Sequence, residues 1–589
     1  MRDANRHLSY AAGAGDRPLL AVTIGQMLDH VVREHGDNEA VVSTFENRRL
    51  TYRQFGAAVD DLALALMAIG VNPGDRVGIW STNCVDWVVV QFATAKIGAI
   101  LVNINPAYRV TELEFALRQS RCSVLLIGEG FKDVNYAETL LEIAPEFRTG
   151  APSAKLPDLR HVITIEGVAA HAGMTAWPDL LAGASSITAP QLAERLTSLD
   201  FDDVINIQYT SGTTGTPKGA MLTHRSILNN GYFVGRRMRL THRDRLCIPV
   251  PFYHCFGMVL ANLACATHGA TMVLPAPHFS PLATLEAVEK ERCTALHGVP
   301  TMFVAELDHP RFAEFDYSTL RTGIMAGAPC PIEVMRRVMT EMHLPEITIA
   351  CGMTETSPVC NMTEVDDPVE MRVGSVGRVM EHQEQKIIDP ATGRTVRRGV
   401  QGELCYRGYQ LMRGYWADPD ATRRTIDDAG WLHGGDLAVM DDQGYLRITG
   451  RLKDMICRGG EKIFPREVEE FLFTHPAIAE AYVFGVPDEY YGEDVAAWVK
   501  LRDGQNLTEE DVRAFCRSRI MAYKVPRRIK FVTEFPTTVT GKIQKYKMRD
   551  ATAREMAQHR QHGREGEDIG RTPDGMPDTR PRAISQDPV

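Results

Sequence analysis

Three features are missing from this sequence, and each absence removes a class of protein. Apolar windows such as residues 88–104 are interrupted by Lys96 and Asn103, so none forms a continuous membrane span. A basic excess is missing as well, because the net charge is −10, and this argues against nucleic acid as the main partner. The first residues also lack the apolar stretch of a signal peptide. We therefore expect a soluble, cytoplasmic protein that makes at most peripheral contact with membranes.

Paired cysteines are missing too. The twelve cysteines include no Cys-x-x-Cys pair, and no spacing in the chain suggests a zinc-like cluster with histidine. Many of them stand among apolar residues, which is typical of buried thiols in a reducing compartment. We therefore predict reduced thiols and no zinc cluster.

Short apolar runs alternate with longer amphipathic ones from Val22 onward. Residues 51–69 have the pattern of a helix, 76–80 that of a strand, and 86–97 again that of a helix. This alternation predicts an α/β fold with parallel or mixed sheets covered by helices. Residues 150–200 contain many glycines and prolines, so we expect a loop-rich connection there.

The most distinctive segment, residues 209–219, reads Tyr-Thr-Ser-Gly-Thr-Thr-Gly-Thr-Pro-Lys-Gly. It lies between a predicted strand at 204–208 and a helix that Thr223 can cap. Free N–H and hydroxyl groups of such a loop can converge on phosphate oxygens, and Lys218 adds positive charge. The segment is not a Walker A loop, because that motif needs Gly-Lys-Ser/Thr and here Pro217 precedes the lysine. We expect a phosphate-binding loop between a strand and a helix.

A second polar segment follows a predicted strand at residues 347–351. Thr354 and Glu355 place a hydroxyl and a carboxylate side by side just beyond that strand. Carboxylate oxygen is the ligand that Mg²⁺ prefers, and two phosphates of ATP can complete its shell. Residues 323–329 predict another strand that ends in a tight turn of small residues, where the backbone could approach a flat ligand closely.

Residues 211–219 resemble the signature of the adenylate-forming enzymes, which include acyl-CoA synthetases, adenylation domains of peptide synthetases and firefly luciferase. The resemblance continues in order along the chain, and segments 298–303, 351–359 and 458–465 are similar to medium-chain fatty-acyl-CoA synthetases. It implies that ATP and Mg²⁺ activate a carboxylic acid, a medium- or long-chain fatty acid, as acyl-AMP with release of pyrophosphate. The acyl group then passes to the thiol of coenzyme A.

The resemblance also implies roles for individual residues. Thr354 is expected at the α-phosphate, Glu355 on Mg²⁺, and Lys542 between the substrate carboxylate and the α-phosphate, with Lys218 as a fourth catalytic residue. The expected nucleotide contacts are Thr210, Ser211, Gly212, Thr213, Thr214, Gly215, Lys218, Gly327, Ala328, Pro329, Cys351, Gly352, Met353, Thr354, Asp436, Arg451 and Lys542. The expected acyl pocket consists of His254, Val299, Met302 and Phe303. The expected coenzyme A channel consists of Gly459, Gly460 and Glu461.

Two positions depart from the family pattern. Cys351 stands where the family usually has an aromatic ring that stacks on adenine, and the loss of that face could cost about 1 kcal/mol of nucleotide affinity. Gly434 stands where the family has Thr. Asp436 is intact, and we expect it on a glycine-supported turn where it accepts two hydrogen bonds from a ribose diol. ATP should therefore bind, though weakly.

The predicted domain order has five parts. They are a polar N-terminal arm (1–20), an AMP- and acyl-binding domain with a β-barrel-like subdomain (21–450), a hinge centred on Lys453 (451–453), a small mobile α+β domain (454–551) and a tail (552–589). The tail contains many charged residues, glycines and prolines but few apolar residues, so we expect it to be disordered.

Three other interpretations stay open at this stage. The first is an aryl or amino-acid activator that loads a carrier protein, although no carrier domain or attachment serine is visible beyond residue 551. The second is a luciferase-like oxygenase, which the acyl-CoA ligase motifs disfavour. The third is a non-catalytic nucleotide-binding relative, suggested by Cys351 and Gly434. The sequence is compatible with a homodimer and does not specify the length of the acyl chain.

Overall fold

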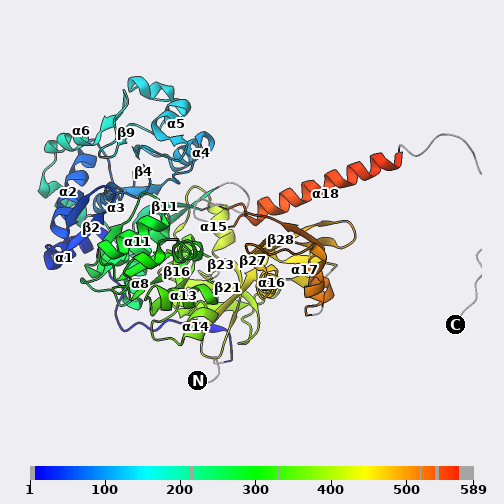
Figure 1. Ribbon diagram of the computed structural model, residues 1–589. Coiled ribbons are helices and arrows are strands. Elements are labelled where there is room, and N and C mark those ends of the chain that lie inside the picture. The colour runs from blue at the N-terminus through cyan, green and yellow to red at the C-terminus, as the bar shows by residue number, and fades with distance from the viewer. Residues whose placement is uncertain are drawn as a thin grey trace, which may run out of the picture. The chain divides into compact units, whose positions relative to one another are not determined.

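The computed structural model describes residues 7–210, 217–328, 330–459, 461–517, 519–537 and 543–568 (Figure 1). They form two compact units that divide between Leu452 and Lys453. The first unit is an α/β domain with large mixed sheets and the second is a smaller α+β domain, so the predicted fold class is confirmed. Within these described ranges, no helix is both long and apolar enough to cross a bilayer.

An eight-stranded sheet forms one layer of the first unit, in the order β10-β9-β6-β4-β5-β11-β12-β22. Strands β10 through β11 in this order are parallel, while β12 and β22 are antiparallel to their neighbours. The strands are β4 (Arg76–Trp80), β5 (Ile100–Asn103), β6 (Val124–Ile127), β9 (His161–Thr164), β10 (Thr175–Ala176), β11 (Val204–Thr210), β12 (Lys218–Thr223) and β22 (Gly414–Tyr415).

A nine-stranded sheet forms a second layer, in the order β19-β18-β17-β16-β15-β13-β14-β2-β3. The central strands from β17 to β2 are parallel, and antiparallel strands complete both edges. The strands are β2 (Glu39–Ser43), β3 (Arg48–Thr51), β13 (Arg245–Cys247), β14 (Thr271–Leu274), β15 (Ala295–Gly298), β16 (Thr322–Ala326), β17 (Glu346–Gly352), β18 (Val359–Met362) and β19 (Arg378–Val379).

Helices fill the space between these two sheets and cover their outer faces (Figure 1). Every residue of α3 (Val85–Ile97) is buried, as expected for a helix that is apolar on all sides, and the core around it includes residues of both sheets. The same middle layer contains α1 (Ile24–His35), α2 (Tyr52–Ala68), α8 (His224–Arg237) and α10 (Ala264–His268). The outer helices are α4 (Val110–Ser120) and α5 (Tyr136–Ile143) on the first sheet, and α11 (Pro281–Lys290), α12 (Pro300–Leu307) and α13 (Ile332–Glu341) on the second.

A five-stranded antiparallel sheet completes the first unit, in the order β1-β20-β21-β23-β24. The strands are β1 (Tyr10–Ala12), β20 (Gln383–Ile388), β21 (Gly402–Gly408), β23 (Leu432–Met440) and β24 (Leu446–Arg451), and α15 (Pro419–Thr425) precedes β23. Part of the arm predicted for residues 1–20 belongs to this sheet, because β1 pairs with β20 from Tyr10↔Lys386 to Ala12↔Glu384. Pairing with a partner more than 370 residues away leaves no local pattern in the sequence.

The predicted loop-rich connection at residues 150–200 is more ordered than expected. It contains β9, β10, α6 (Trp177–Ala182) and α7 (Ala189–Thr197). Leu180, Leu192 and Leu196 are buried, so a few apolar residues between the glycines and prolines are sufficient to dock both helices.

The second unit consists of a sheet covered by helices on both faces. Its strands are β25 (Ile456–Arg458), β26 (Glu461–Ile463), β27 (Ile478–Asp488), β28 (Gly492–Leu501) and β29 (Arg528–Phe531), and its helices are α16 (Pro465–Leu472), α17 (Glu509–Arg517) and α18 (Lys545–Asp568). Residues on β28 alternate between two apolar clusters: Val495, Ala497 and Val499 pack with α16 and α17, while Ala496 and Trp498 pack with α18.

The prediction of a disordered tail from residue 552 was wrong for the residues that belong to α18. Met548, Thr552 and Met556 are buried, and their spacing of four residues places them on one face of the helix. Trp498 Nε1 donates a hydrogen bond to Thr552 Oγ1 at 3.0 Å. The composition of the segment is polar, but three correctly spaced side chains dock the helix on β28.

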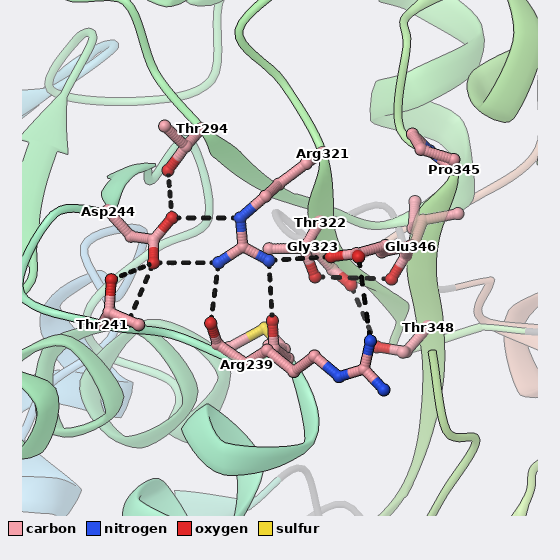
Figure 2. Close-up of polar contacts among 12 residues, drawn as sticks. Arg239, Thr241, Asp244, Thr294, Arg321, Thr322, Gly323, Pro345, Glu346 and Thr348 are labelled. Atoms are coloured by element: carbon pink, nitrogen blue, oxygen red, sulfur yellow. Dashed lines mark hydrogen bonds and ion pairs between the residues drawn. The ribbon is translucent and has the colours of Figure 1, made fainter. Parts of the chain in front are cut away.

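Arg321 connects the amino-terminal ends of several strands in the nine-stranded sheet (Figure 2). Its guanidinium contacts Asp244 Oδ2 at 2.8 Å and Glu346 Oε2 at 2.7 Å, and donates to the backbone oxygens of Met238 and Arg239. With Nε to Asp244 Oδ1 at 3.2 Å, these are five hydrogen bonds, equal to the number of N–H donors in the group. Burial raises the pKa of Asp244, but the hydrogen bonds from Arg321 and Thr294 and the charge of Arg321 together outweigh burial, so the pKa is lowered.

We predict that Arg321→Met lowers the free energy of unfolding by about 2–3 kcal/mol, because Asp244 is left buried without its charge partner. Arg337→Met is the matched control: its carboxylate partners Asp308 and Glu341 are exposed, and the expected loss is below about 1 kcal/mol. Chemical denaturation of the full chain measures both. Since the lowered pKa of Asp244 contributes stability only above its unfolded pKa, the Arg321→Met loss should shrink as the pH falls below about 4. Equal losses in the two variants would contradict the role of Arg321.

Candidate functional site

The carboxyl-terminal ends of β15, β16 and β17 lie at one edge of the nine-stranded sheet, because the three strands are parallel neighbours. Ligands of open α/β sheets bind at this edge. Gly327 follows β16 with φ +86°, and a side chain there would approach Val299 Cγ1 to 3.2 Å. At Gly352, the last residue of β17, a Cβ would lie 1.8 Å from the backbone oxygen of Pro358, so only glycine fits. The structure thus brings the predicted residues Val299, Gly327 and Gly352 to the same edge.

Glu355 lies in a single 3₁₀ turn, η5 (Thr354–Thr356), directly beyond β17. Its side chain is nearly buried, and Tyr415 donates its hydroxyl hydrogen bond to Glu355 Oε1 at 2.7 Å. Lys218 Nζ lies 5.0 Å from the centre of the Tyr415 ring. The structure therefore brings the expected metal ligand and the expected phosphate-binding lysine close to one tyrosine.

Tyr415 was not among the predicted site residues. It belongs to β22, which pairs with β12 in the eight-stranded sheet. Burial raises the pKa of its hydroxyl well above the usual range, and the neighbouring Glu355 raises it further. A protonated phenol beside a carboxylate is a donor that can fix the orientation of that carboxylate. The only hint in the sequence was an aromatic residue directly after Gly414.

The predicted phosphate loop connects two strands, which corrects one expectation. Thr210 ends β11 and pairs with Lys218, the first residue of β12. The helix begins at His224 with Thr223 as its cap, as predicted, but the sequence pattern did not indicate that residues 218–223 form a strand before it. Gly219 to Thr223 continue as a mostly buried strand that pairs with β11. The predicted loop therefore joins two antiparallel strands and does not lead directly into a helix. Ser211, Gly212, Thr213, Thr214 and Gly215 lie outside the described residues.

Asp436 lies within strand β23 and not on the turn that the sequence suggested. Arg451 of the neighbouring strand β24 donates from Nε to Asp436 Oδ1 at 3.0 Å, so the two predicted nucleotide residues form an ion pair. Gly435 has φ +68°, and the pairing of β23 with β21 is irregular at this point. A Cβ on Gly434 would lie 3.7 Å from Met353 Sδ, so this strand lies close to the residues beyond β17.

The predicted acyl-pocket residues do not all come together. Tyr253, next to His254, accepts hydrogen bonds at its backbone oxygen from Gln208 and Asn103, which ties this segment to β11 and β5. Met302 is buried in the core between the two sheets. Phe303, the next residue, is buried in the apolar cluster on the outer face of the second sheet. Neighbours on a helix point in different directions, so the structure separates Phe303 from Met302.

The remaining predicted residues belong to other parts of the chain. Ala328 follows Gly327, and Cys351 is the partly buried residue before Gly352. In the second unit, Lys453 lies in a 3₁₀ turn (Leu452–Asp454), Gly459 follows β25 with φ +56°, and Glu461 begins β26. Pro329, Gly460 and Lys542 lie outside the described residues.

Comparison with known proteins assigns a family to this site. The model of the AMP-binding enzyme family matches residues 28–416, and that of the AMP-binding enzyme C-terminal domain matches residues 467–542. The chain belongs to the AMP-binding enzyme family. The predicted resemblance is therefore confirmed.

Similar proteins cover almost the whole chain. YngI of Bacillus subtilis, named as an acyl-CoA synthetase, is 49% identical over 538 residues, which are 91% of this chain and 98% of YngI. The mitochondrial medium-chain acyl-CoA ligase ACSF2 of Danio rerio is 44% identical over 554 residues, 93% of this chain and 91% of the ligase. Among solved structures, the anthranilate CoA ligase AuaEII in complex with anthranoyl-AMP is 28% identical with a TM-score of 0.79, and the match covers 92% of this chain and 99% of that one.

We predict that Tyr415→Phe lowers the rate of adenylate formation by this AMP-binding enzyme about 10–100-fold and raises the Mg²⁺ concentration it needs, because Glu355 loses the donor that orients it. The ring beside Lys218 is retained, so ATP binding should change little. Pyrophosphate release measured across a magnesium titration separates the two effects. Tyr317→Phe is the matched control, since the Tyr317 hydroxyl donates to a backbone oxygen among the outer helices. An unchanged magnesium requirement in Tyr415→Phe would refute the orienting role.

We also predict that Gly434→Thr, which restores the family residue, is accommodated. The nearest atoms to a Cβ there are Leu404 O at 3.6 Å and Met353 Sδ at 3.7 Å, which are ordinary contacts. The free energy of unfolding should rise by about 0.5–1 kcal/mol, because threonine loses less backbone entropy than glycine and favours a strand. Gly435→Thr is the control and should lose about 1–2 kcal/mol, since Gly435 has a positive φ. The ATP KM of Gly434→Thr should not exceed that of the wild type; a clear increase in a folded variant would show that the strand lies elsewhere relative to the nucleotide.

Proposed function

We propose that this AMP-binding enzyme is an ATP-dependent acyl-CoA synthetase that activates a medium-chain fatty acid as acyl-AMP and transfers it to coenzyme A. The observation that carries the proposal is the cluster of Lys218, Tyr415 and Glu355 beyond the ends of parallel strands. The medium-chain specificity of ACSF2 supports the choice of acid, as does the identity of 44% over 93% of this chain.

The chemistry follows from charge. A carboxylate that approaches a polyphosphate is repelled by it, so the α-phosphate must be neutralised while pyrophosphate leaves. Mg²⁺, when bound, would supply that neutralisation as a Lewis acid, and the hard carboxylate oxygens of Glu355 fit it. Tyr415 holds Glu355 in one orientation, and Lys218 places a positive charge near the same point. No general base is needed, because a carboxylic acid is already ionised at neutral pH.

The remaining site residues enter the proposal by their place in the family pattern. Asp436, paired with Arg451, binds the ribose, and Gly327 with Ala328 allows the adenine to approach the backbone. Met302 and Val299 contribute to the acyl pocket, whereas Phe303 supports α12 from the outer core. The cytoplasmic location and the homodimer stay predictions.

Aryl acids are the second candidate substrate class. The anthranilate CoA ligase AuaEII, which binds anthranoyl-AMP, has a TM-score of 0.79 to this chain. AMP formation measured with coenzyme A and a panel of C2 to C18 fatty acids, with anthranilate and benzoate added, tests both classes. We expect the highest kcat/KM near the middle of the fatty-acid series. A preference for the aryl acids would replace the proposed substrate, and no AMP formation with any acid would favour the non-catalytic alternative.

We predict reciprocal defects for two variants. Lys542→Ala should lower acyl-AMP formation about 10²–10³-fold, the effect of one lost charge-assisted contact, and retain thioester formation from supplied acyl-AMP. Lys453→Pro should do the reverse, because proline fixes φ at the proposed hinge and the second unit must turn between the two steps. Lys453→Ala is the control for the lost charge and should be much milder. Equal losses in both half-reactions for Lys542→Ala, or normal rates in both for Lys453→Pro, would contradict the proposed division of labour.

A further inference from the structure

Glu403, Cys405 and His433 lie close together on the antiparallel sheet, and no motif in the sequence links the three residues. Glu403 and Cys405 are two residues apart on β21, so their side chains lie on the same face of the strand. His433 on β23 is the cross-strand partner of Cys405. One ligand atom from each residue lies within 4.8 Å of the other two. The spacing of cysteines and histidines in the sequence does not indicate this cluster, because strand pairing joins residues that are 28 positions apart.

The separations between the ligand atoms suit a tetrahedral metal ion. His433 Nδ1 lies 3.2 Å from Glu403 Oε2 and 3.6 Å from Cys405 Sγ. Ordinary zinc bond lengths at tetrahedral angles give about 3.4 Å between nitrogen and oxygen and about 3.6 Å between nitrogen and sulfur. A metal ion could enter among these three atoms with little movement of the strands.

A second carboxylate orients the imidazole. His433 Nε2 lies 3.4 Å from Asp427 Oδ2, and the other oxygen of Asp427 accepts hydrogen bonds from the backbone of Ala429 and Trp431. A carboxylate on the far nitrogen of a metal-binding histidine is the usual arrangement in zinc proteins, where it fixes the tautomer and the ring. The anchored Asp427 would leave Nδ1 of His433 free to face Glu403 and Cys405.

Charge and access also fit a cation. Glu403 and Asp427 contribute two negative charges; Lys386 lies near Cys405, and Arg407 lies near Asp427 but is itself paired with Glu384. Cys405 is fully buried, and a bound metal would favour the thiolate form of its side chain. His433 and Asp427 are partly exposed, which provides a path from solvent.

We propose that Glu403, Cys405 and His433 form a binding site for Zn²⁺, with water in the fourth position and Asp427 as the orienting residue. The ion would join β21 to β23 beside the irregular pairing that precedes Asp436. The bound ion would hold β23 in place, and β23 carries Asp436, the proposed ribose contact. This inference does not depend on which acid the enzyme activates.

Zinc binding to the metal-free full chain tests the proposal. We would titrate Zn²⁺ by calorimetry in the presence of excess Mg²⁺, which occupies sites made of oxygen ligands alone, and use Co²⁺ as a spectroscopic probe of thiolate coordination. The wild type should bind one equivalent, show a thiolate-to-cobalt absorption band, and gain thermal stability with zinc. Cys457→Ser, which changes the exposed cysteine, is the matched control and should behave like the wild type.

Two variants decide the outcome. Asp427→Asn removes the orienting carboxylate at a partly exposed position and should weaken zinc binding about 10–100-fold. Cys405→Ser should weaken it more and abolish the thiolate band, with circular dichroism as the check that the buried substitution still folds. Zinc affinity unchanged in Asp427→Asn, or a wild-type cobalt complex without a thiolate band, would overturn the proposal and leave the three residues as a hydrogen-bonded cluster.

Discussion

The parallel arrangement of β15, β16 and β17 is the constraint on which the rest of the site depends. Parallel neighbours send their carboxyl-terminal ends to one edge, so Val299, Gly327 and Gly352 meet there although they are separated by 28 and 25 residues of sequence. Arg321 ties down the opposite edge, where all five of its N–H donors are used. With the amino-terminal edge held in place, the loops at the carboxyl-terminal edge can carry ligand-binding residues on a rigid scaffold.

Glu355 shows how separate sheets combine at that edge. It follows a strand of the nine-stranded sheet, whereas Lys218 and Tyr415 belong to the eight-stranded sheet. The two-residue strand β22 is too short to stabilise itself, but its pairing with β12 is enough to aim the Tyr415 hydroxyl at Glu355.

The antiparallel sheet fixes the position of Asp436. Asp436 is held by Arg451 across two paired strands, so the proposed ribose contact does not rely on a mobile loop. The glycines before Asp436 interrupt the regular pairing and let β23 pass close to Met353. The interruption falls between Glu403 and Cys405 on β21, so the proposed zinc site would join β21 to β23 across it.

The sequence by itself determined the fold class and the helices at 51–69 and 86–97, because short-range patterns carry that information. The roles of Lys218, Thr354 and Glu355 follow from motifs and stay predictions. Only the tertiary structure decided which residues meet. Strand pairing brings Tyr415 to Glu355, His433 to Cys405 and β1 to β20. Such pairing leaves no periodicity in the sequence of either partner. Composition also failed to predict α18, because its stability depends on a tertiary contact. Met548 and Met556 are buried against an apolar cluster that includes Trp498 of β28.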